Sequence, residues 1–182
     1  MTIGALLLAA GQSRRMGAAK LALPYRGRPL ITHALAMLDA SQTPTIIITG
    51  AHEALLLPLL AGRTTIHAAH HAMGLAHSLH AGLAAIPADW TGFLVMLADM
   101  PNIRPDTITA LKRALASGAE AAIPTHQGRR GNPIAFARQT IPALMTLRGD
   151  SGARTIINQL NPKEIPVSDP GILQDIDRKS DL

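Results

Sequence analysis

Residues 8–20 read Leu-Ala-Ala-Gly-Gln-Ser-Arg-Arg-Met-Gly-Ala-Ala-Lys, and they follow directly on the apolar run 3–8. An apolar run of this length is typical of a strand that is buried on both faces. The small residues behind it allow backbone N–H groups to approach an oxyanion, while Arg15 and Lys20 bring positive charge to the same turn. The stretch therefore predicts a strand that ends in a cradle for a polyphosphate.

Two common nucleotide motifs are absent from this turn. Gly17 is not followed by Lys and then Ser or Thr, as the Walker pattern requires, and there is no GxGxxG. A P-loop ATPase and a Rossmann dehydrogenase are therefore disfavoured. Taken alone, two glycines beside two arginines could also form a simple solvated turn.

The rest of the chain alternates short apolar runs with longer segments of helical periodicity, which is typical of a layered α/β fold. We expect strands at 3–8, 45–49, 64–67, 93–97, 121–124 and 134–136. We expect helices at 29–39, 53–60, 75–86, 105–117, 141–147 and 153–160, with Pro29 and Pro105 in first turns and Ser151 just before the last helix. The tail 161–182 has enough apolar residues to pack back on the same domain.

Composition narrows the class of protein. The 182 residues are 47% hydrophobic, enough for one domain over 1–182 with a sizeable core, and only 2% aromatic, which argues against a β-sandwich or barrel. The net charge of +5 suits anions, but few aromatics are available to stack on bases, so we expect small polyphosphates and no nucleic acid. There is no cysteine, and no apolar stretch reaches the ~20 residues of a membrane span. We expect a cytoplasmic protein without a membrane partner.

A carboxylate follows the predicted strand 93–97. Asp99 lies at its carboxyl end, where α/β proteins place ligands, and Pro101 stiffens the turn. Asp99 could instead cap a helix, but the next predicted helix begins too far along, at Pro105. Mg²⁺ prefers oxygen ligands and usually keeps waters, so Asp99 and one further carboxylate would be sufficient to hold it.

Three other stretches have more than one interpretation. His77 and His80 share a helical face, but no third ligand with zinc spacing accompanies them, so we interpret them as surface histidines. Residues 124–133 are typical of a hairpin that carries Arg129 and Arg130, and such a run usually forms a solvated basic loop. Gly-Asp-Ser-Gly at 149–152 also surrounds the nucleophile of trypsin-like proteases, but those are β-barrels with cysteines.

Residues 8–20 resemble the signature L-A-A-G-x-S-x-R-x-G-x-x-K of the MobA-like NTP transferase family, to which the molybdenum cofactor nucleotidyltransferases belong. The resemblance implies a three-layer α/β/α fold, Rossmann-like and similar to nucleotide-diphospho-sugar transferases, with a mainly parallel mixed sheet. It also implies catalytic roles for Arg15, Lys20 and Asp99. The nucleotide-binding residues that it implies are Leu8, Ala9, Ala10, Gly11, Ser13, Arg14, Lys20, Gly74 and Ser78.

The remaining motifs of the resemblance extend over almost the whole chain. Asp99 lies in a string similar to L-A-D-x-P, whose Asp binds Mg²⁺, and Asp177 matches the second Asp of the terminal D-I-D-T-P-E-D-L. That terminal motif departs here, because residues 178–180 are Arg-Lys-Ser instead of Thr-Pro-Glu. The strings G-x-x-G-N-P and G-D-x-G-A-R imply an acceptor site formed by Arg130, Asn132, Asp150 and Arg154, with Arg129 as the alternative to Arg130 for an acceptor phosphate.

The form Ala9-Ala10-Gly11 resembles the cytidylyltransferase branch rather than the guanylyltransferase branch, which carries Ala-Gly-Gly. We therefore expect a Mg²⁺-dependent CTP:molybdopterin cytidylyltransferase that releases pyrophosphate and serves a recipient molybdenum hydroxylase. The alternatives are a guanylyltransferase, a nucleotidyltransferase for sugar or polyol phosphates, and a non-catalytic carrier of nucleotide or cofactor.

Overall fold

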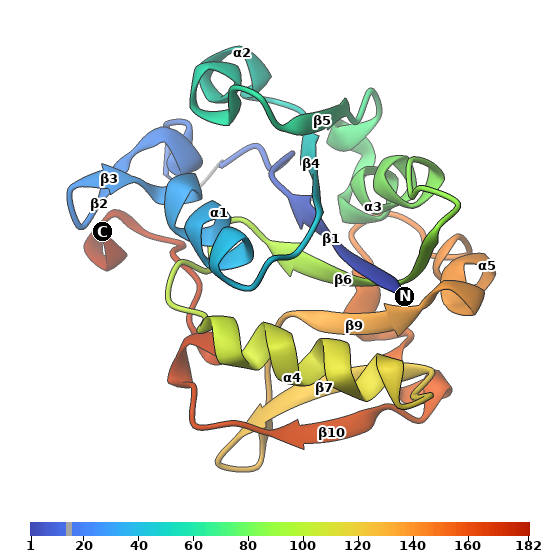
Figure 1. Cartoon of the computed structure of the whole chain (residues 1–182). Coiled ribbons are helices and arrows are strands. Elements are labelled where there is room, and N and C mark those ends of the chain that lie inside the picture. Colours follow the sequence, from blue (N-terminus) through green and yellow to red (C-terminus); the bar gives the residue numbers. More distant parts are fainter. Residues whose placement is uncertain (14–15) are drawn as a thin grey trace.

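The computed structural model describes residues 1–13 and 16–182. At its centre, β1 (Thr2–Leu8) pairs in parallel with β4 (Thr45–Thr49) on one side and with β6 (Trp90–Leu97) on the other. The main sheet has the order β10-β7-β9-β6-β1-β4-β5 (Figure 1). The strands beyond these three are β5 (Thr64–His67), β7 (Ala121–His126), β8 (Arg129–Arg130), β9 (Ile134–Ala137) and β10 (Lys163–Pro166).

The sheet is parallel except where β9 lies antiparallel between β6 and β7 and where β8 pairs with β7. Helices cover both faces, because alternate residues of β1 belong to two separate cores. Leu7 packs in the core with α1 (Leu30–Ala40) and α4 (Pro105–Ala116). Leu6 packs in the other with α3 (Leu75–Ala84) and α5 (Ile141–Leu144). The predicted three-layer fold with a mainly parallel mixed sheet is confirmed.

Three predicted helices are shorter or of another type. The segment predicted as a helix over 53–60 divides into α2 (Glu53–Leu56) and a 3₁₀ turn, η2 (Leu57–Leu60), because Pro58 has no N–H to continue an α-helix. The helix predicted over 141–147 ends at Leu144. The helix predicted over 153–160 is wrong: two 3₁₀ turns stand there, η5 (Ala153–Thr155) and η6 (Ile157–Leu160), in keeping with a β-branched run that disfavours helix.

Smaller expectations also fail. Pro29 precedes α1 as its N-cap, whereas Pro105 does begin α4, and Gly152 rather than Ser151 lies before η5. The strand β5 lacks the two-sided burial that an apolar run predicts for a central strand; it is partly exposed because it forms one edge of the sheet. Sequence reasoning did not predict β10, which forms the other edge, or the hairpin of β2 (Pro24–Tyr25) and β3 (Arg28–Pro29).

The tail after β10 packs back on the domain, as predicted. It contains η7 (Pro170–Leu173) and η8 (Lys179–Asp181), and Ile172 is fully buried. Asp169 is 2% exposed and accepts hydrogen bonds from the Arg104 N–H (2.8 Å) and the Thr107 hydroxyl (2.7 Å), which ties the tail to the start of α4. Among the residues that the structure describes, no helix is both long and apolar enough to cross a bilayer.

Candidate nucleotide-binding site

The carboxyl ends of three neighbouring strands meet at one edge of the sheet. Leu8 is in register with Ile48 of β4 and Leu97 of β6. The Ala9 N–H donates to the Ile48 carbonyl (2.8 Å), and the Ala98 N–H donates to the Leu8 carbonyl (3.1 Å). The turn after β1 and the turn that carries Asp99 are therefore held side by side by the sheet itself, at the edge where parallel α/β sheets bind ligands.

A cavity of about 540 Å³ opens over this edge. Its size is that of a pocket for a nucleotide-sized molecule. Residues that the sequence predicted for the site line much of it: Leu8, Ala9, Ala10, Gly11, Ser13, Lys20, Gly74, Ser78, Asp99, Asp150 and Asp177. Its wall thus brings together segments from both ends of the chain.

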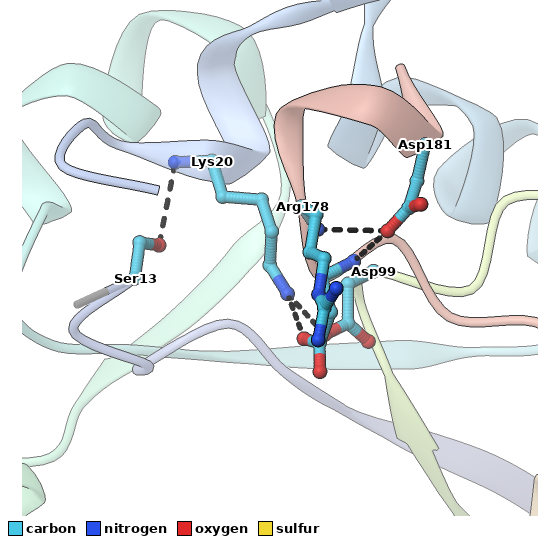
Figure 2. Close-up of polar contacts among 6 residues, drawn as sticks. Ser13, Lys20, Asp99, Arg178 and Asp181 are labelled. Carbon is cyan, nitrogen blue, oxygen red and sulfur yellow. Dashed lines mark hydrogen bonds and ion pairs between the residues drawn. The ribbon is translucent and has the colours of Figure 1, made fainter. Parts of the chain in front are cut away.

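Lys20 joins the two predicted metal carboxylates. It begins η1 (Lys20–Ala22), and its Nζ lies 2.7 Å from Asp99 Oδ2 and 3.1 Å from Asp177 Oδ1. Figure 2 shows the Lys20 side chain reaching from η1 to Asp99, while its backbone N–H points to Ser13 (3.3 Å to Oγ) on the preceding turn. The side chains of Lys20 and Asp99 are only 11% and 20% exposed, whereas that of Asp177 is 40% exposed.

Burial and neighbouring charge shift the pKa values of Lys20 and Asp99 in opposite directions. Burial alone would lower the pKa of Lys20, but the carboxylates of Asp99 and Asp177 outweigh it and raise the pKa above the ordinary value. Burial raises the pKa of Asp99, and the charge of Lys20 opposes that rise. The ammonium group therefore stays charged at neutral pH and acts as the counter-ion of a carboxylate that the fold has taken out of water.

The same carboxylates fit a divalent cation. Asp99 Oδ1 is buried and has no hydrogen-bond partner among the residues that the structure describes. A buried, unpartnered carboxylate oxygen is costly unless a ligand satisfies it. Asp99 and Asp177 supply hard oxygen donors, which Mg²⁺ and Mn²⁺ prefer.

In the described part of the chain no group of three or more His, Asp or Glu side chains is placed to hold a metal ion, so the histidines 70, 77 and 80 form no zinc site there.

The predicted cradle is described only in part. Ser13 adopts a positive φ of 49°, and its carbonyl accepts a hydrogen bond from the Met16 N–H (3.0 Å). Arg14 and Arg15, predicted to bind the nucleotide and to assist catalysis, lie outside the described residues.

The opposite wall is built by close backbone packing. Gly74, the N-cap of α3, has φ +117°, and a Cβ there would lie 2.3 Å from the Gly149 carbonyl. The Gly149 carbonyl accepts a hydrogen bond from the Ala76 N–H (3.0 Å), which holds the segment 148–152 against the start of α3. This contact brings Asp150 and the buried Ser78 to the same cavity.

The four predicted acceptor residues are not brought together. Asp150 lines the 540 Å³ cavity, but Arg130 and Arg154 line a separate cavity of about 190 Å³. Arg130 there forms an ion pair with Glu164 (2.7 Å), which satisfies its charge. Asn132 lines neither cavity, and its N–H donates to the Ile172 carbonyl (2.9 Å). The hairpin predicted at 124–133 does form, between β7 and β8.

Sequence reasoning missed several residues of the cavity wall, namely Gln12, Met16, Leu21, His71, Ala72, Met73, Leu75 and Leu97. Gln12 and Met16 lie within the quoted turn and could have been included for that reason. His71 and Met73 lie on the 3₁₀ turn η3 (His71–Met73), directly before Gly74, and no motif singled them out.

Comparison with known proteins agrees with this geometry. Residues 5–164 match the family model described as the MobA-like NTP transferase domain. The purine catabolism protein PucB of Bacillus subtilis is 31% identical over 94% of this chain and 90% of its own length. A molybdenum cofactor guanylyltransferase of Vibrio cholerae is 27% identical over 90% of this chain and 81% of its own length.

A solved structure shares the fold over the full length of the chain. Rv0371c from Mycobacterium tuberculosis, in a complex with manganese, aligns with a TM-score of 0.86 at 24% identity, over 100% of this chain and 96% of its own. The strand order and the cavity at the strand ends are consistent with this likeness. The chain therefore belongs to the MobA-like NTP transferase family, a family of nucleotidyltransferases.

Proposed function

We propose that the chain is a cytidylyltransferase that transfers the CMP group of CTP to the phosphate of a molybdopterin-type acceptor and releases pyrophosphate. The observation that supports the transferase assignment most directly is the contact between Lys20 and Asp99. Their Nζ and Oδ2 atoms lie 2.7 Å apart, and both residues line the same cavity, one after β1 and the other after β6. We further propose that residues 1–182 act as one domain, because the cavity wall needs residues from Leu8 to Asp177.

The reaction needs no nucleophile from the protein. An oxygen of the acceptor phosphate attacks the α-phosphorus of the nucleotide in line, and a new P–O bond forms. The bond from the α-phosphorus to the bridging oxygen breaks, and its electron pair leaves on pyrophosphate. The protein contributes position and positive charge, which can supply most of the acceleration of such a transfer.

Within the cavity, each described group has a defined task. Backbone N–H groups of the turn after β1, together with Ser13, hold phosphate oxygens, and Lys20 supplies positive charge at the same end. Gly74 and Ser78 support the nucleoside from the start of α3, and the sequence adds the charge of Arg14 and Arg15, which lie outside the described residues, to the turn after β1. Asp150 borders the cavity beside Gly74 and is the predicted acceptor residue that this site retains.

Asp99 and Asp177 are the residues that would hold Mg²⁺. A divalent cation at these carboxylates would neutralise charge on the phosphates and on the departing pyrophosphate. Asp99 is held in place for this task, because it lies two residues after the end of β6 and its carbonyl accepts a hydrogen bond from the Ile176 N–H (2.9 Å). That same bond brings the segment with Asp177 to it.

The choice of CTP rests on Ala9-Ala10-Gly11. Ala10 is among the residues that line the cavity, and the resemblance of this string to the cytidylyltransferase branch supports CTP. A guanylyltransferase is the second candidate, and the relative from Vibrio cholerae, named as a molybdenum cofactor guanylyltransferase, favours it.

The test is pyrophosphate release measured with each of the four NTPs and Mg²⁺, against molybdopterin, methylerythritol phosphate and sugar phosphates as acceptors. We expect release with CTP and molybdopterin. Release with GTP instead would favour the guanylyltransferase, and release with another acceptor would assign a different branch. Nucleotide binding without release under any combination would favour a non-catalytic carrier and refute the enzyme.

The matched variant is Asp99→Ala. We expect it to abolish pyrophosphate release while the far-ultraviolet spectrum and the cooperative unfolding transition remain, since Asp99 contributes no apolar side chain to either core. An unchanged rate of pyrophosphate release would show that Asp99 has no role in the reaction. Transfer of the finished dinucleotide cofactor to a molybdenum hydroxylase would be the subsequent step of this proposal.

A further inference from the structure

The second carboxylate of the cation site lies on a segment with little packing of its own. Asp177 lies between buried Ile176 and the exposed turn η8. Its side chain is 40% exposed, twice the exposed fraction of Asp99. Besides the contact of its carboxylate with Lys20 Nζ (3.1 Å), Asp177 therefore depends on the backbone of residues 176–178 for the direction of its side chain.

That backbone is fixed from two sides. On one side, the Ile176 N–H donates to the carbonyl of Asp99 (2.9 Å). On the other side, a single oxygen of Asp181, Oδ2, accepts the N–H of Asp177 (3.0 Å) and the N–H of Arg178 (2.7 Å). Figure 2 shows the Asp181 side chain pointing back from η8 to the backbone at Arg178.

Asp181 also closes the turn that it caps. Its own N–H donates to the Arg178 carbonyl (3.0 Å), and its second oxygen, Oδ1, accepts the Ser180 hydroxyl (3.3 Å). Both carboxylate oxygens are thus used within the turn. Asp181 is therefore placed to hold the backbone rather than to act as a third ligand of a cation.

This arrangement bears on the departure in the terminal motif. The side chains of Arg178, Lys179 and Ser180 replace Thr-Pro-Glu, and all three residues are exposed. The turn over these residues forms nevertheless, because Asp181 at its end supplies the acceptor for the two N–H groups at its start. The Asp181 carboxylate thus contacts the backbone N–H of Asp177 although residues 178–180 are altered.

We propose that Asp181 is a positioning residue of the cation site: its carboxylate holds the N–H groups of Asp177 and Arg178 and thereby directs the Asp177 carboxylate toward Asp99. The consequence for catalysis rests on the proposed function, but the consequence for cation binding does not. The proposal concerns hydrogen-bond acceptance and not negative charge, because Asp181 Oδ2 contacts two backbone N–H groups.

The chain offers a variant that separates these two properties. Asp181→Ala removes the acceptor, whereas Asp181→Asn keeps one oxygen to accept both N–H groups and removes the charge. Asp106→Ala is the control for loss of one exposed acidic side chain, since Asp106 lies at the start of α4 and pairs with Arg104. Asp177→Ala gives the loss of Mn²⁺ affinity that is expected when the second carboxylate is absent.

The experiment measures Mn²⁺ affinity of the full chain without nucleotide, from the free Mn²⁺ signal in electron paramagnetic resonance. In parallel, amide hydrogen exchange of residues 177 and 178 is followed without metal. We expect Asp181→Ala to lose protection at both amides and to weaken Mn²⁺ binding by about five- to tenfold, toward the value of Asp177→Ala. Asp181→Asn and Asp106→Ala should stay within about twofold of the unaltered chain.

Three outcomes would overturn the proposal: an unaltered chain that binds no Mn²⁺, wild-type Mn²⁺ affinity in Asp181→Ala, or an equal loss in Asp181→Asn, which would assign the effect to charge. Melting temperatures serve as the folding control, because Asp181 is exposed and its replacement should leave both cores intact. The proposed function is tested separately, by pyrophosphate release. If the variants show the expected pattern of Mn²⁺ binding but the unaltered chain releases no pyrophosphate, the proposed function fails and the role of Asp181 stands.

Discussion

Replacement of Lys20 by Met tests whether the fold depends on its internal cation. Met keeps the length and the apolar stem of lysine and removes the ammonium group, so Asp99 loses its counter-ion while packing is largely retained. The expected result is a protein that is less stable in the absence of divalent metal, because an ionised carboxylate at 20% exposure is left without a partner.

The magnitude follows from the burial of the pair. Exposed ion pairs contribute about 0–1 kcal/mol, and removal of one member of a fully buried pair costs about 3–5 kcal/mol. Lys20 and Asp99 are largely buried, but Asp177 opens to the cavity, so we expect a loss of about 2 kcal/mol. For a chain of this length, that loss corresponds to a fall in melting temperature of about 4–8 °C.

The pH dependence has a definite sign. Burial raises the pKa of Asp99 above its ordinary value of 3.8, and the removal of Lys20 would raise this pKa further. A carboxyl whose folded pKa exceeds its unfolded pKa destabilises the folded state when it ionises. The difference in stability between the two proteins should therefore be full at neutral pH and narrow as the pH falls through the raised pKa of Asp99 toward 3.8.

The assay is differential scanning calorimetry across pH, with and without Mn²⁺. Mn²⁺ should raise the melting temperature of Lys20→Met more than that of the unaltered chain, because the cation replaces the lost charge. Lys112→Met is the matched control: Lys112 donates to the carbonyls of Ser41 and Gln42 and has no carboxylate partner among the described residues, so its loss should respond neither to acid nor to Mn²⁺. Equal melting temperatures at neutral pH, or a difference that grows in acid, would refute the reasoning.

Three further predictions concern residues that line the two cavities. Ala10→Gly should raise the use of GTP relative to CTP by about tenfold, measured as the ratio of kcat/KM values, because Ala10 lines the cavity where the guanylyltransferase branch carries glycine; an unchanged ratio would show that Ala10 does not select the base. Gly74→Ala should cost about 1–3 kcal/mol in calorimetry and slow pyrophosphate release, because φ is +117° and the new Cβ meets the Gly149 backbone at 2.3 Å; normal stability would contradict that packing. Arg154→Met should leave KM for both substrates within about twofold, since Arg154 lines the separate 190 Å³ cavity, and a large rise in acceptor KM would restore its predicted role.

Much of the fold could be predicted from the sequence because its signals are local. A buried parallel strand reads as an unbroken apolar run, so β1, β4 and β6 were located with their flanking turns. The edge strand β10 reads Lys-Glu-Ile-Pro and carries no such signal, because a strand at an edge needs few apolar side chains. The segment 153–160 was mistaken for a helix because apolar spacing alone does not separate an α-helix from two 3₁₀ turns.

The sequence by itself determined the chemistry of this site: a turn of small residues with lysine after one buried strand, and a carboxylate after another. Only the tertiary structure decided which groups meet. Lys20 lies 79 residues from Asp99 and 157 from Asp177, and parallel pairing of β1 with β6 brings the first two together. Strand pairing does not fix where the loops pack. Arg130 and Arg154 therefore line another cavity, although their motifs resemble those of an acceptor site. Sequence spacing encodes local conformation, whereas contact between distant loops depends on how the layers pack around the sheet.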